Sequence, residues 1–119
     1  FWTEGVGTAA ALATLQIMKK IKSYDHVNKT GLYIKKNWQN ISKLNGIPIE
    51  ILGMNGIPKF SIKHKNWTKI RVFLIESFLK KNLLASNVIY ISTEHKRKIL
   101  EEYFDILNET FFKIKKNFL

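Results

Sequence analysis

Three histidines and a pair of adjacent glutamates are the residues of this chain whose types could support acid–base or metal chemistry. His26, His64 and His95 lie far apart in the sequence, without the spacing of metal ligands. Glu101 and Glu102 are neighbours in a helical pattern, so their side chains point to different faces and do not share a proton. Cysteine is absent, which excludes thiolate metal sites. These residues predict no catalytic or metal site within the segment.

A glycine pair near the start is the one feature that resembles a phosphate-binding loop. Gly5 and Gly7 precede a helical pattern, but no strand comes before them and the third glycine of a dinucleotide fingerprint is missing. A nucleotide-binding loop is therefore not expected.

The chain is strongly basic, with a net charge of +11 from 20 basic and 9 acidic residues. Arg71 and Arg97 are the only arginines; the other cations are lysines, which are less suited to bidentate base and phosphate contacts. We expect no nucleic-acid partner, although a small basic nucleic-acid-binding module stays open as an alternative. No apolar run reaches the roughly 18 residues of a membrane span, so no membrane partner is expected. The absence of cysteine fits a cytoplasmic protein.

The elements that must position any site follow from hydrophobic periodicity. Apolar spacing predicts helices over 8–22, 26–44 and 67–81 and a last helix from Ser92 or Thr93 to 116. Alternation and short apolar runs predict strands over 47–52, 59–64, 83–85 and 88–91. The order indicates an α+β fold, in which helices cover a small, mainly antiparallel sheet of three to four strands. Residues 1–22 form an entry segment and a long interdomain helix, and residues 23–119 form a small C-terminal domain.

Three polar positions predict where helices begin or end. Asp25 and Asn66 are candidate N-caps for the second and third helices. Asn45-Gly46 ends the second helix, because this pair tolerates the positive φ of a helix C-terminus.

The first fifteen residues carry the most specific pattern. They run from an aromatic, turn-rich entry into a block of alanines that lets another backbone approach closely. Such a surface predicts an interface with a partner and, in the isolated segment, self-association through this helix.

This block resembles a stretch of class III aminotransferases, which depend on pyridoxal 5'-phosphate, and is most like the branch of glutamate-1-semialdehyde aminomutase. The matching residues are Phe-Trp-Thr-Glu at 1–4 and Thr-Ala-Ala-Ala-Leu-Ala-Thr-Leu at 8–15. Further matches follow in order: His-Val-Asn-Lys-Thr-Gly at 26–31, Gly-Ile-Pro-Lys-Phe at 56–60, Phe-Leu-Lys-Lys-Asn-Leu-Leu at 78–84 and Ser-Thr-Glu-His at 92–95. The resemblance therefore covers essentially the whole chain.

The resemblance implies the C-terminal small domain of a fold-type I enzyme that transfers an amino group to or within a keto or aldehyde substrate. The domain would act as a substrate-side lid and as a contact in a homodimer. The cofactor lysine would lie in an upstream cofactor-binding domain, so the segment alone would be inactive. Thr3 is the nearest hydroxyl to the position of the family's phosphate-binding threonine. A non-catalytic interaction domain descended from such an enzyme is the other alternative.

The chain departs from the family pattern in two residues and in one loop, and the loop concerns substrate identity. Gly5 stands where the family usually has arginine and Thr8 where it has proline. The loop between Ile91 and Ser92, which helps to close the family's substrate pocket, is also shorter here.

Overall fold

The structure, a computed structural model, describes residues 4–119 and has the expected α+β fold. Its elements in chain order are α1 (Gly5–Ile21), α2 (Ser23–Asn45), β1 (Ile49–Leu52), β2 (Lys59–Ile62), α3 (Trp67–Leu79) and α4 (Arg97–Phe118). Among these described residues, none of the helices has the length and apolar content that a bilayer crossing requires.

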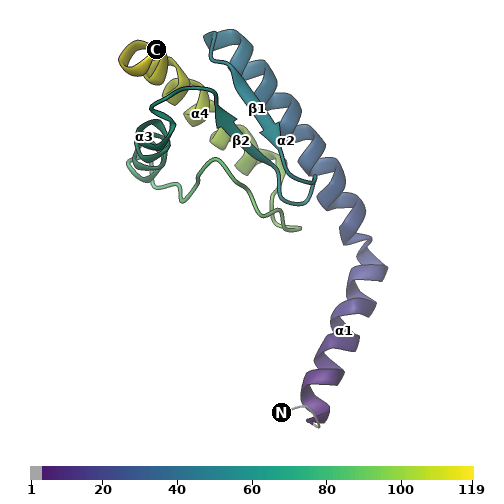
Figure 1. The fold of residues 1–119 in the computed structure, drawn as a ribbon. Coiled ribbons are helices and arrows are strands. Elements are labelled where there is room, and N and C mark those ends of the chain that lie inside the picture. Colours follow the sequence, from purple (N-terminus) through teal and green to yellow (C-terminus); the bar gives the residue numbers. More distant parts are fainter. Residues whose placement is uncertain (1–3) are drawn as a thin grey trace.

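The elements form a packed body from which the first helix projects (Figure 1). Helix α2 lies along the β1–β2 hairpin and packs on α4, and α3 packs on the other side of α4. Helix α1 extends away from the body, and the molecule is consequently elongated, measuring 56 × 28 × 25 Å.

The core is built from the apolar stripes of α2, α3, α4 and the inward face of the hairpin. In α3 the stripe of Ile70, Leu74 and Phe78, which are spaced four residues apart, is fully buried. In α4 Leu100 is buried, whereas its neighbour Ile99 is about half exposed. The other buried apolar residues of the core are Ile34, Trp38, Ile41, Ile47, Phe60, Ile62, Tyr103, Phe104, Ile106, Leu107, Phe111 and Ile114. Burial of each large side chain stabilises the fold by roughly 1.5–3 kcal/mol.

The described residues form a two-stranded sheet rather than the three to four strands expected from the sequence. Strands β1 and β2 are antiparallel, with Ile49 opposite Ile62 and Leu52 opposite Lys59. The expected strand at 83–85 is absent from the described sheet, and the one at 88–91 makes only a single bridge, between Lys59 and Val88.

Pro58 explains why this third segment stays outside the sheet. Residues 87–91 run antiparallel to β2 and its preceding turn: the Phe60 N–H donates to the Asn87 carbonyl, and the Ile89 N–H donates to the Pro58 carbonyl. Proline has no N–H, so Pro58 cannot donate to the Ile89 carbonyl in exchange, and the ladder of hydrogen bonds is interrupted there. At the neighbouring position the Asn87 side-chain amide, not its backbone, donates to the Phe60 carbonyl, at 2.8 Å.

Helix ends agree with the sequence at Gly46 and Asn66 and differ at Asp25. Gly46 ends α2 with a φ of 60°, as predicted. Asp25 is not a cap, because α2 already begins at Ser23, after Lys22 turns the chain with a φ of 49°. Asn66 occupies the predicted N-cap position of α3, although its side chain makes no capping hydrogen bond.

The loop between the two strands is fastened to α2 at a glycine. A Cβ atom at Gly31 would overlap the backbone carbonyl of Asn55, so only glycine allows this approach. Lys35 Nζ donates to the Gly53 carbonyl at 2.7 Å and to Asn55 Oδ1 at 2.9 Å. The Asn55 amide in turn donates to Asn28 Oδ1 at 2.7 Å.

Gly31→Ala is expected to lower the free energy of unfolding by about 1–3 kcal/mol, because the added methyl group forces the loop away from α2. Gly7→Ala is the matched control, since a Cβ there meets nothing within 4 Å. It should leave stability unchanged or raise it by up to about 1 kcal/mol. Urea denaturation measures both, and equal effects of the two substitutions would contradict the close approach.

Candidate functional site

Helix α1 has a broad apolar surface that the rest of the described chain does not cover. None of its residues is buried. Its exposed large apolar side chains are Val6, Leu12, Leu15, Ile17, Met18 and Ile21, and the remaining side carries Gln16 and Lys20. Large exposed apolar surfaces commonly mark sites of interaction with a partner. Helix α1 is therefore a surface of the kind that a partner covers.

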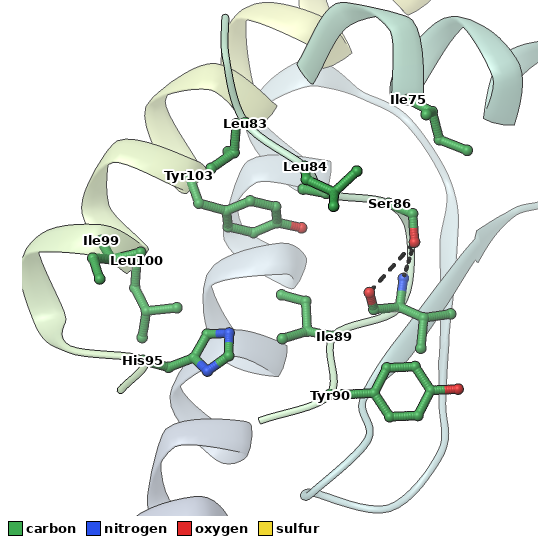
Figure 2. Close-up of a pocket in the computed structure, with 12 residues that line it drawn as sticks. Ile75, Leu83, Leu84, Ser86, Ile89, Tyr90, His95, Ile99, Leu100 and Tyr103 are labelled. Carbon is green, nitrogen blue, oxygen red and sulfur yellow. Dashed lines mark hydrogen bonds between the residues drawn. The ribbon is translucent and has the colours of Figure 1, made fainter. Parts of the chain in front are cut away.

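The second feature is a cavity of about 500 Å³ between the end of α3, the segment 83–90 and the start of α4. Its walls are mainly aliphatic, and the polar side chains among them are those of Ser86, Tyr90, His95 and Tyr103 (Figure 2). The aliphatic lining consists of Ile75, Leu83, Leu84, Ala85, Val88, Ile89, Ile99 and Leu100. Both the volume and the lining are typical of small-molecule sites, which span about 300–1,000 Å³.

Two turns place the segment 83–90 against α4. After α3 the chain reverses at Asn82, whose φ is 59°, and the Leu83 N–H donates to the Phe78 carbonyl at 3.0 Å. This is the left-handed ending that helices commonly adopt. Further along, Ser86 Oγ accepts from the Val88 N–H at 3.2 Å and also lies 3.4 Å from the Val88 carbonyl, as Figure 2 shows.

Tyr103 forms the buried wall of the cavity on α4. Its ring stacks on Phe78 at 5.3 Å, and its hydroxyl oxygen accepts a hydrogen bond from Trp38 Nε1 at 2.9 Å. Burial raises the pKa of Tyr103 well above that of an exposed tyrosine, and the bond from Trp38 opposes this only in part. The phenol therefore stays neutral. No described residue accepts the proton of this hydroxyl.

His95 lies at the rim of the cavity and is held by Ser92. The Ser92 N–H donates to His95 Nδ1 at 3.0 Å, and Ser92 Oγ lies 3.1 Å from the same nitrogen. Because a backbone N–H can only donate, Nδ1 must be the acceptor, which places the ring proton of the neutral imidazole on Nε2. Because residues 92–95 form this turn, the last helix begins at Arg97 and not at Ser92 or Thr93 as predicted.

The other candidate residues do not come together. His26 Nε2 lies 3.4 Å from Thr30 Oγ1, and His64 Nδ1 accepts from the Asn66 N–H at 3.3 Å. Within residues 4–119, no three histidine, aspartate or glutamate side chains gather as metal ligands. Glu101 pairs with Arg97 at 2.9 Å, whereas Glu102 is exposed. Thr3 lies outside the described residues.

The cavity does not supply the lysine that a pyridoxal phosphate enzyme requires. No lysine is among the residues that line it. The described lysines are exposed except Lys35, which is half-buried and bonded to the hairpin loop. The described residues alone therefore do not fit a cofactor-binding centre.

The comparisons with known proteins support the fold and leave the family open. No protein-family model matches the sequence, and no curated protein matches it. The structure is similar to that of the FumI protein of Sphingopyxis sp. MTA144, solved in its PLP internal aldimine form, with a TM-score of 0.85 and 18% sequence identity. The match covers 99% of this chain but 29% of that one, so the chain spans less than a third of the solved protein. The likeness shows that the two share this fold.

Tyr103→Phe is expected to lower the free energy of unfolding by about 1–3 kcal/mol at neutral pH, because it leaves the buried Trp38 N–H without an acceptor. Tyr90→Phe, at an exposed tyrosine of the same cavity, should change it by less than about 0.5 kcal/mol. Urea denaturation at pH 7 compares the three proteins.

The same comparison has a defined pH dependence. Burial raises the pKa of Tyr103 in the folded state. Its contribution to the free energy of unfolding is therefore complete below the pKa of a tyrosine in the unfolded chain, about 10, and is lost as the pH rises beyond that value. The stability difference between the native chain and Tyr103→Phe should narrow above that pH. A difference that stays constant between pH 9 and 11 would contradict a buried, neutral phenol.

Proposed function

We propose that this chain is the C-terminal portion of a pyridoxal phosphate-dependent aminotransferase or aminomutase of class III, similar to the glutamate-1-semialdehyde aminomutase branch. In this role it transfers no amino group by itself. It covers the substrate side of a pocket whose cofactor and lysine belong to an upstream domain of the same polypeptide.

The observation that carries the proposal is the fold similarity to a protein solved in a PLP-bound form. The similarity extends over 99% of this chain and corresponds to 29% of the solved chain. A piece of that size is expected to leave surfaces uncovered that the rest of the enzyme would bury. The uncovered apolar helix α1 is such a surface.

A lid role is consistent with how α1 joins the body. Lys22 lies in the left-handed region between α1 and α2, and the two helices are otherwise nearly separate. If α1 is anchored on the cofactor domain, a small change at this junction moves α2 and, with it, the cavity beside α4. Loop and domain closures of this kind expel water and complete active sites in many enzymes.

The remaining parts of the proposal follow from the resemblance. The protein would act as a cytoplasmic homodimer on a small amino or keto substrate. Thr3 would contribute to binding of the cofactor phosphate.

The test begins with the coding sequence upstream of Phe1, which should encode a cofactor domain with a lysine shortly before this segment. The complete polypeptide, purified after expression, should retain pyridoxal phosphate and convert an amino donor. The 119-residue chain alone should leave the absorbance of added pyridoxal phosphate unchanged. An upstream sequence without such a domain would contradict the proposal.

A variant pair tests the contribution of α1. Leu12→Asp with Leu15→Asp in the complete polypeptide should lower kcat/KM at least about tenfold, because it loosens the placement of the lid. Leu44→Asp with Phe112→Asp introduces the same charges at exposed apolar residues outside α1 and serves as the control. Equal kcat/KM values for the two variants would show that α1 does not anchor the lid.

A further inference from the structure

We propose that the cavity beside α4 binds an uncharged aliphatic segment of a small molecule that carries one hydrogen-bond-accepting oxygen. This inference rests on the proposed function: the aliphatic segment is the part of the amino or keto substrate that is remote from the reacting group. The inference thus names a substrate class: aliphatic compounds with a carbonyl or hydroxyl oxygen, not compounds with a second charged group.

The apolar walls argue for an aliphatic occupant. Leu84 is 90% exposed and Ile99 48% exposed, yet both lie at the edge of a concave surface whose deeper wall is Leu100 and Tyr103. An aliphatic chain there would cover these side chains, and each buried methylene would contribute about 0.8 kcal/mol.

The absence of charge in the lining argues against an ionic occupant. No lysine, arginine, aspartate or glutamate is among the described residues that line the cavity. An ammonium group placed in these walls would lose its hydration without gaining an acceptor, and a carboxylate would find hydrogen-bond donors but no opposite charge to offset its lost hydration, which is costly. The nearby cations Lys29, Lys96 and Arg97 border a separate surface hollow on the other side of His95.

The polar groups of the cavity argue for an acceptor oxygen. The Tyr103 oxygen already accepts from Trp38, so its own proton is left to be donated. Figure 2 shows the Tyr103 ring extending from α4 toward the segment that carries Leu84 and Ile89. His95, with Nδ1 engaged by Ser92, also has a donor remaining at Nε2. A buried donor without a partner is unfavourable, and a carbonyl or hydroxyl oxygen satisfies it.

The binding test uses the 119-residue chain and methyl NMR, with 2-hexanone, 2-heptanone, n-hexane and sodium hexanoate as probes. The ketones should shift the methyl signals of Leu84, Ile89 and Ile99 saturably, with an affinity gain of about fourfold for the added methylene. Hexanoate, of equal length but charged, should bind at least about tenfold more weakly than 2-hexanone.

Three variants separate the two parts of the inference. Tyr103→Phe should weaken 2-hexanone about two- to tenfold and leave n-hexane unchanged, a selectivity that general loosening of the fold would not produce. Leu84→Asp alters an exposed wall residue and should weaken both probes at least about tenfold. Phe112→Asp, at an exposed residue farther along α4, should weaken neither.

Several outcomes would overturn the inference: shifts confined to the α1 methyl groups, shifts that do not saturate, or hexanoate binding as tightly as 2-hexanone. None of these measurements involves the cofactor. Saturable ketone binding in a protein that lacks a pyridoxal phosphate domain would therefore reject the proposed function and support the cavity as a binding site. An active enzyme that binds no ketone would support the proposed function and reject the cavity as a binding site.

Discussion

The packing of α2 on α4 around Trp38 is the interaction on which the other elements depend. The Trp38 ring is fully buried, meets Phe60 of the hairpin edge-to-face at 4.9 Å, and donates to Tyr103 of α4. One side chain therefore connects two helices and the sheet. Phe60 also contacts Phe111 at 5.7 Å, which extends the cluster along α4. Tyr103 of this cluster forms one wall of the cavity, and the segment 83–90 forms the wall that faces it.

Helix α1 has the opposite relation to this core. It meets α2 at Lys22, and none of its residues shares the burial that stabilises the body. A 17-residue helix without packing is only marginally stable in water. Its apolar surface is therefore best understood as one half of an interface. A partner that binds α1 would also fix the direction of α2, and thereby the position of the cavity relative to that partner.

The features that the sequence predicts are those decided by local residue patterns. The α+β order and the end of α2 at Gly46 follow from periodicity and from a positive φ. The strand count could not be predicted, because it depends on the pairing of Pro58 with a segment about thirty residues away. The start of α4 depends on a side-chain bond between Ser92 and His95, which competes with helix formation. The cavity could not be found either, since its aliphatic residues come from three segments and are generic one by one.

Amide hydrogen exchange of α1 tests the central claim, that this helix is completed by a cofactor domain, most directly. In the dilute 119-residue chain, the amides of α1 should exchange at least about a hundredfold faster than those of α2, because only α2 is packed into the body. In the complete polypeptide the α1 amides should become as protected as those of α2. Equal protection of both helices in the dilute chain, or an α1 that still exchanges rapidly in the complete polypeptide, would contradict the account.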